Sequence, residues 1–137
     1  MSEMDKTPVS NDLLEWLRAI GASHRRLKCF AVYLRSLANV RMVTHVAEMP
    51  DLTDAYRLEQ YVDAELDSGE ALSWCLEITV SQRCIAVEAD VRRVQSGGQD
   101  VVLSIGEFVY STPAACSAAL PAIADRLCGA IPSEVMT

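Results

Sequence analysis

The 137-residue sequence lacks the cysteine patterns that would place it in a metal-binding or disulfide-rich class. It has no pair of cysteines separated by two residues, and its five cysteines are widely spaced, at Cys29, Cys75, Cys84, Cys116 and Cys128. An odd number at this spacing argues against a structural zinc site or a compact disulfide framework. We therefore expect reduced thiols that serve as small apolar side chains in a reducing compartment.

Long hydrophobic runs and leader-like segments are also missing. No stretch approaches the roughly 18 apolar residues that suggest a membrane-spanning helix. The first ten residues carry Glu3 and Asp5 and no apolar core, which argues against a signal peptide. We expect a cytoplasmic protein that binds no membrane.

Basic residues are outnumbered, with 12 Lys and Arg against 19 Asp and Glu and a net charge of −7. Such a field repels nucleic acid and favours basic partners. Hydrophobic residues make up 50% of the chain, and its length is that of one domain with a sizeable core. We predict a mobile tail at 1–9, a single domain at 10–131 and a second tail at 132–137.

Three helices are predicted in the N-terminal half. The first begins at the capping residues 10–12 and ends at Gly21, and the second begins at Ser23. The stretch 40–46 is rich in β-branched residues and fits either a strand or the end of the second helix. A third helix is predicted at 53–67, where apolar residues recur at helical spacing: Ala55, Leu58, Val62 and Leu66.

From Leu72 the apolar period changes from 3.6 to 2, which is typical of a strand. Two further strands follow, the second starting near Ile85 and the third spanning 100–110, and Gly106 indicates a bulge in the third. A last helix begins at Thr112-Pro113, where a capping hydroxyl precedes a proline in the first turn. Pro121 is expected to kink this helix or to split it.

The predicted fold class is therefore α+β, with three N-terminal helices, a three-stranded antiparallel meander and a C-terminal helix. One sheet face is apolar, so the helices are expected to pack on that face. The opposite face is left for solvent or for a partner.

Signatures of catalysis and cofactor binding are scarce. The two histidines, His24 and His45, belong to no recognisable motif, and we expect a solvated His24 and a core or edge His45. Gly97-Gly98 lies in a hairpin turn and not before a helix, so it does not predict a phosphate site. We predict no enzyme, no cofactor and no metal.

One carboxylate cluster is consistent with two interpretations. Glu77, Glu88 and Asp90 are expected on the outer sheet face, where carboxylates can bind a divalent metal or act as acid and base. Arg92, across the sheet, instead fits a solvated face of alternating charge. We favour the solvated face.

Charges are segregated along the chain. Residues 25–41 hold five basic residues and no acidic one, whereas residues 48–77 hold nine acidic residues and only Arg57. These charges either pair within the molecule or leave an acidic stripe that steers a basic partner. Whether the basic stretch forms a second contact surface stays open.

The acidic stripe is the predicted binding site. In a helix, Glu59, Asp63 and Asp67 would stack at i, i+4 and i+8, and such like charges disfavour the helix unless a cationic partner covers them. Aromatic and amide side chains beside them would add contacts typical of interfaces. The predicted partner-binding residues are Tyr56, Glu59, Gln60, Asp63, Asp67, Glu77, Glu88 and Asp90.

Three segments carry a resemblance to a known class: the acidic run 51–77, the stretch ALSWCLEITVSQRCIAVEADV and the capped tail helix STPAACSAALPAIADRL. Their pattern resembles the small immunity proteins of bacterial toxin systems, including those of contact-dependent inhibition. The resemblance implies a cytoplasmic protein, a monomer or weak dimer, that blocks a cognate toxin with a basic surface, commonly a nuclease.

The alternative is a type III secretion chaperone, which the chain resembles in size, acidity and α+β content. That class interrupts its strands with a helix and adds two strands after it, whereas no strand is expected after Tyr110. An enzyme that uses Glu77, Glu88 and Asp90 is the third hypothesis.

Overall fold

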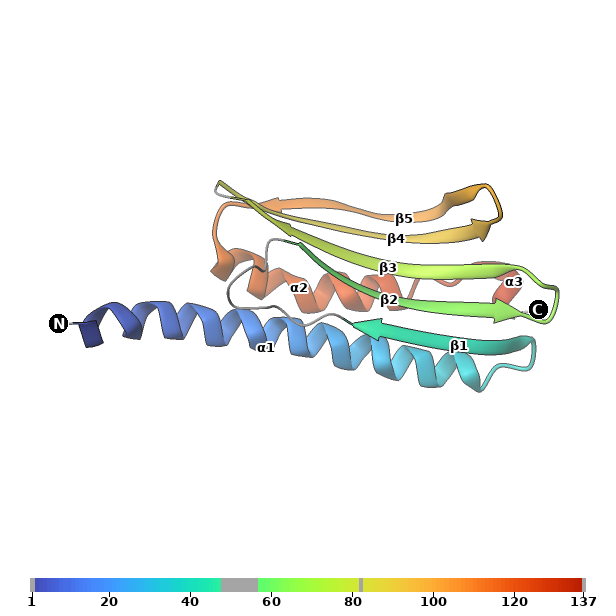
Figure 1. Cartoon of the computed structure of the whole chain (residues 1–137). Coiled ribbons are helices and arrows are strands. Elements are labelled where there is room, and N and C mark those ends of the chain that lie inside the picture. Colours follow the sequence, from blue (N-terminus) through green and yellow to red (C-terminus); the bar gives the residue numbers. More distant parts are fainter. Residues whose placement is uncertain (1, 48–56, 82, 137) are drawn as a thin grey trace.

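The structure is a computed structural model that describes residues 2–47, 57–81 and 83–136, with only the backbone described for residues 2–13. Three helices and five strands follow one another along the chain (Figure 1). They are α1 (Ser2–Arg35), β1 (Val40–Ala47), β2 (Arg57–Leu66), β3 (Ala71–Val80), β4 (Ile85–Gln95), β5 (Gly98–Tyr110), α2 (Pro113–Cys128) and α3 (Ser133–Met136).

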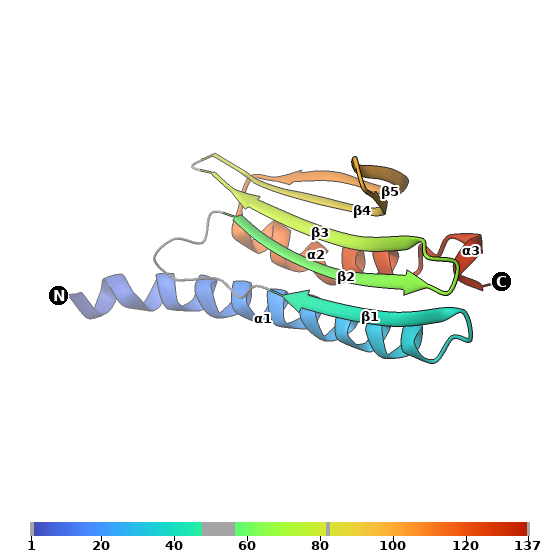
Figure 2. The same ribbon diagram turned by 45° about the vertical axis from the view of Figure 1, so that its right-hand side comes forward.

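The five strands form one antiparallel sheet in the order β1-β2-β3-β4-β5, so each strand pairs with its neighbour along the chain. The two long helices lie on one side of this sheet, and α1 extends past the strands at its N-terminal end (Figures 1 and 2). α1 contacts α2, β1 and β2, whereas α2 contacts β3, β4 and β5. The sheet therefore has an inner face that meets the helices and an outer face on which no described helix lies.

The inner face forms the core because every second residue of the central strands points toward the helices. In β2 the even-numbered residues are buried, and in β3 the buried even-numbered residues are Leu72, Trp74, Leu76 and Ile78. Trp74 of β3 is fully buried and meets Phe30 of α1 edge-on, with 5.0 Å between ring centroids. Its indole Nε1 donates a hydrogen bond of 2.8 Å to the carbonyl of Ala130. Trp74 therefore joins the sheet to α1 and to the segment after α2.

The prediction of separate first and second helices is wrong, because α1 continues through Gly21 and Ser23. A glycine inside a helix costs about 1 kcal/mol relative to alanine, and burial of Ile20, Leu27 and Leu34 against the sheet outweighs it. Ser23 does not cap a second helix. Its Oγ donates 3.2 Å to the Ala19 carbonyl within α1.

The predicted third helix is wrong as well, because residues 57–66 form β2. Leu58, Val62 and Leu66 are spaced by four, which approximates a helical repeat and is also a multiple of the strand period. All three face the helices from β2. The stretch 40–46 proves to be a strand, and residues 53–56 lie outside the described part of the chain.

The sheet thus has five strands and not the predicted three, although β3, β4 and β5 occupy the predicted segments. The bulge near Gly106 is confirmed by a register shift between β4 and β5 and by a φ of 145°. The predicted cap of α2 is also confirmed, since Thr112 Oγ1 accepts a 3.2 Å hydrogen bond from the Ala115 amide. α2 continues through Pro121 without splitting.

Candidate functional site

The outer face of the sheet gathers charged side chains from four strands. It displays seven carboxylates, from Glu59, Asp63, Glu65, Glu77, Glu88, Asp90 and Glu107. The arginines that ion-pair with these carboxylates are Arg41, Arg57 and Arg92. We call this surface the acidic sheet face. The predicted acidic stripe exists, but on a sheet and not on a helix.

Four glutamates lie directly opposite one another across four strands. The Cα register pairs Glu59 with Glu77, Glu77 with Glu88, and Glu88 with Glu107. Like charges directly opposite each other destabilise a sheet, and two arginines offset part of this repulsion. Arg57 bonds to Glu77 and lies 3.2 Å from Glu59, and Arg92 lies 3.8 Å from Glu88. We refer to these four residues as the glutamate row.

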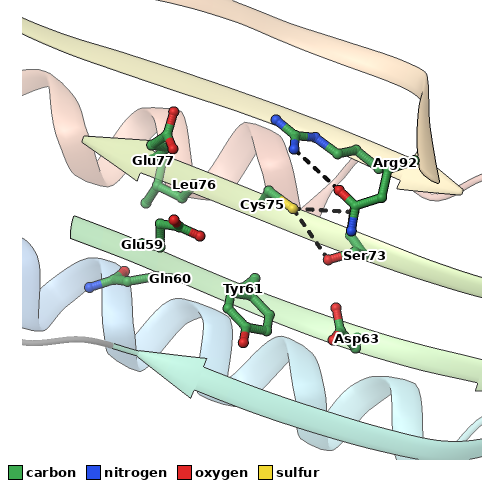
Figure 3. A pocket seen from close by; sticks show the side chains of 10 residues that line it. Glu59, Gln60, Tyr61, Asp63, Ser73, Cys75, Leu76, Glu77 and Arg92 are labelled. Atoms are coloured by element: carbon green, nitrogen blue, oxygen red, sulfur yellow. Dashed lines mark hydrogen bonds between the residues drawn. The ribbon is translucent and has the colours of Figure 1, made fainter. Parts of the chain in front are cut away.

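Beside the glutamate row the acidic sheet face contains a hollow of about 270 Å³. Figure 3 shows Glu59 and Tyr61 on β2 beside Cys75 and Glu77 on β3. Asp63 also lines the hollow, and its Oδ1 atom is buried without a hydrogen-bond partner among the described residues. A carboxylate oxygen in this state favours a cationic donor from outside the chain.

Asp90 is the one carboxylate of the acidic sheet face that is almost fully buried, at 4% exposure. Arg92 Nε donates 2.7 Å to its Oδ1, and Arg92 Nη2 donates 3.2 Å to its Oδ2. These hydrogen bonds raise the pKa of Arg92 above its ordinary value. Arg92, which lines the hollow, is therefore held in place there by the buried Asp90.

Cys75 also lines the hollow and is half-buried there. Burial raises the pKa of its thiol, although a hydrogen bond with Ser73 at 3.2 Å opposes the shift. A thiol held protonated is a poor nucleophile at neutral pH. Cys75 therefore contributes shape to the hollow and little reactivity.

The structure distributes the predicted binding residues over different surfaces. Glu59, Asp63, Glu77, Glu88 and Asp90 meet on the acidic sheet face. Gln60 and Asp67 lie elsewhere, and Tyr56 falls outside the described residues. Gln60 points toward α1 with 1% exposure, and its Nε2 donates 3.4 Å to the Ile20 carbonyl, whereas Asp67 is exposed in the turn after β2. The predicted helical stripe of Glu59, Asp63 and Asp67 is thus corrected to a cluster from three strands.

Sequence reasoning missed Tyr61, Glu65 and Glu107 as members of this face. Tyr61 and Glu65 share the odd-numbered side of β2 with Glu59, so the strand period would have found them. Glu107 follows the bulge at Gly106, which changes the side on which later residues of β5 lie.

The alternative in which the acidic segment pairs with the preceding basic stretch is seen at one ion pair, between Arg41 of β1 and Glu65 of β2 at 2.9 Å. Among the described residues, the basic side chains of α1 form no ion pair with the carboxylates of the acidic sheet face. Arg26 of α1 instead pairs with Asp125 of α2, at 2.5 Å. Arg18, Arg25 and Lys28 are exposed on α1. Charge is therefore separated between the helical layer and the acidic sheet face.

Comparison with protein-family models, with curated proteins and with solved structures finds no match to this chain. Within the described residues, no three His, Cys, Asp or Glu side chains gather in an arrangement suited to a metal ion. No described helix combines the length and hydropathy of a membrane-spanning segment.

Proposed function

We propose that this protein is a non-catalytic binding protein whose acidic sheet face takes a basic surface of a protein partner. The observation that carries this proposal is the glutamate row with the adjoining hollow, where like charges are held together at a cost to the fold. A cationic partner would turn that repulsion into attraction. It would also raise the association rate and disfavour acidic competitors.

The first candidate class is the immunity protein, which binds a toxin with a basic surface in the cytoplasm and covers its active site or an adjacent surface. An open sheet face can serve this role from a single copy of the chain, because no second subunit is needed to complete the hollow. A nuclease is the expected toxin, since enzymes that act on nucleic acid carry basic surfaces.

The second candidate is a type III-like secretion chaperone, which the chain resembles in size, acidity and α+β content. From β2 to β5 the described strands follow one another without an intervening helix, so the helix that interrupts the strands of that class is not found in this part of the chain. A stable dimer would favour the chaperone, whereas a monomer would favour the immunity protein.

The carboxylates of the acidic sheet face support binding better than catalysis. Glu77 is bonded to Arg57, and Asp90 and Glu88 both contact Arg92. These carboxylates are engaged by arginines of the same chain, whereas a general acid or base has to be positioned against a substrate. The two histidines lie between α1 and β1, on the inner side of the sheet.

The test is binding to the protein encoded beside this gene, if that protein is a secreted toxin or effector, measured by isothermal titration calorimetry. The double variant Glu59→Gln/Asp63→Asn removes two charges from the hollow without changing side-chain shape. We expect affinity to fall by at least about 100-fold, because two hydrogen bonds to charged groups are lost and each contributes about 1.5–3 kcal/mol.

The matched control is Glu15→Gln/Asp100→Asn, which removes the same net charge from exposed positions outside the hollow. We expect the control to change affinity less than threefold at 0.15 M salt, because exposed charges that do not line the hollow are screened by salt and contribute little. Equal losses in the two double variants would show that only net charge matters, and unchanged affinity in both would reject the acidic sheet face as the binding site.

A further inference from the structure

Two histidines meet at the contact between α1 and the edge strand β1. Their ring centroids are 5.0 Å apart, with the planes tilted by 47°. His24 Nδ1 and His45 Nε2 are both buried, and neither has a hydrogen-bond partner among the described residues. The two rings therefore meet in a partly buried contact, where a positive charge on His45 would face the second ring without a hydrogen-bond partner among the described residues.

Within the part of the chain that the structure describes, the groups around this pair are cationic or neutral. α1 contributes Lys28 and Arg35, whose charges act on His45 together with His24. β2 is the other element packed against β1, and it places Val62 directly opposite His45. The carboxylates of β2 lie on the other face of the sheet, so no acidic group of the described residues is placed to compensate a charged imidazole.

We propose that His24 and His45 form an acid-sensitive contact that releases the edge strand β1 from α1 when the pH falls. Protonation of His45 places a charge against His24, Lys28 and Arg35 in a buried contact. When β1 separates from α1, the charged His45 imidazole is exposed to water. This role lies beyond the proposed binding function and does not depend on it.

The direction of the pH effect follows from the protonation of His45. Burial, followed by the neighbouring charges, lowers the pKa of His45 below 6.5. The released strand therefore binds more protons than the packed strand at pH values below about 6.5. The contact is fully stable above that pH and weakens as the pH falls toward the lowered pKa.

The consequence reaches the acidic sheet face through strand pairing. β1 pairs Thr44 with Asp63 and Val46 with Tyr61, so two residues of the hollow lie beside this strand. Loss of β1 would leave the edge of β2 unpaired next to the hollow. A fall in pH would therefore weaken the acidic sheet face at its β1 side only.

The experiment is backbone hydrogen exchange on the whole chain between pH 7.5 and 5.0, expressed as protection factors so that intrinsic exchange rates cancel. We expect protection of the β1 amides to fall by up to about tenfold per pH unit below 6.5, the limit for one linked proton. The amides of β3 and β4 serve as the internal reference and should change much less. Equal loss in all strands, or constant protection of β1, would overturn the proposal.

The variant His45→Gln keeps a polar side chain and removes the titration. We expect β1 protection in this variant to be independent of pH over the same range. If the variant fails to fold, titration of the histidine ring resonances in the unmodified protein decides the question, because a pKa of His45 at or above 6.5 contradicts the proposal. Glu59→Gln/Asp63→Asn should retain the acid response, which separates this contact from the binding function.

Discussion

The inner and outer faces of the sheet are made by alternate residues of the same five strands, yet their chemistry is opposite. On β3, Leu72, Trp74 and Ile78 are fully buried against the helices, whereas Glu77 and Thr79 point away from them. The apolar inner face determines which segments pack together. The outer face can carry repulsive charges because burial of apolar surface in the core offsets their cost to stability. Substitutions on the two faces should therefore differ by several kcal/mol in their effect on the free energy of unfolding.

The largest effect is expected from Trp74→Ala on the inner face. This change removes the contact with Phe30 and the hydrogen bond to Ala130 and leaves a large cavity. We expect the free energy of unfolding to fall by about 3–5 kcal/mol in urea denaturation. Thr79→Ala, an exposed change on the same strand, is the control and should cost less than about 0.5 kcal/mol. Similar costs for the two variants would remove the distinction between the faces.

Gly106→Ala should have the second largest effect. Gly106 has a φ of 145°, and an added Cβ would lie 2.9 Å from Cζ of Phe108, which packs against the core. We expect a loss of about 1–3 kcal/mol in the same measurement. Gly97→Ala is the matched control, since its added Cβ would meet no atom within 4 Å. A neutral Gly106→Ala would mean that the bulge adapts freely.

Asp90→Asn tests a charged position of the outer face that is buried as deeply as the core. The amide keeps the shape of the side chain but loses the charge that Arg92 contacts through two hydrogen bonds. We expect a loss of about 1–2 kcal/mol, because bonds between charged groups are the stronger ones. Glu88→Gln, which changes a more exposed carboxylate near the same arginine, should cost less than about 0.5 kcal/mol. The reverse order would show that burial of Asp90 does not matter.

The smallest effect is expected from Arg41→Ala. Its guanidinium lies 2.9 Å from Glu65, but both side chains are exposed. An ion pair of this kind contributes about 0–1 kcal/mol, and salt screens it. Thermal denaturation at 0.05 M and 0.5 M salt should show a difference between variant and parent that shrinks with salt. A larger, salt-independent loss would indicate that Arg41 also packs against β1.

The sequence correctly predicted those parts of the fold in which the apolar residues follow a single clear period. In β3 and β4 strict alternation placed Glu77, Glu88 and Asp90 on the outer face, as the structure confirms. At Thr112 the capping hydroxyl and the following proline act locally, so the start of α2 was predictable as well.

The remaining parts depended on tertiary contacts that local patterns do not contain. In β2 the spacing of Leu58 and Val62 fits two periods, and the inward position of the polar Gln60 obscured the alternation. The segment forms a strand because its backbone pairs with β1 and β3. The acidic sheet face could not be assembled beforehand, because the opposition of Glu59 and Glu77 depends on the register between strands.

β5 is one edge of the sheet, and its irregularity has a consequence for the protein at high concentration. Register shifts interrupt its pairing with β4 at two places, and Arg126 Nη2 donates 3.3 Å to the Ile105 carbonyl while its guanidinium lies 5.6 Å over the Phe108 ring. A strand from a neighbouring molecule would have to pair with the bent edge strand β5, in which the Ile105 carbonyl already accepts a hydrogen bond from Arg126. Bends of this kind are a common defence against edge-to-edge aggregation, so fibril growth from this margin is disfavoured despite the exposed Val101 and Val109.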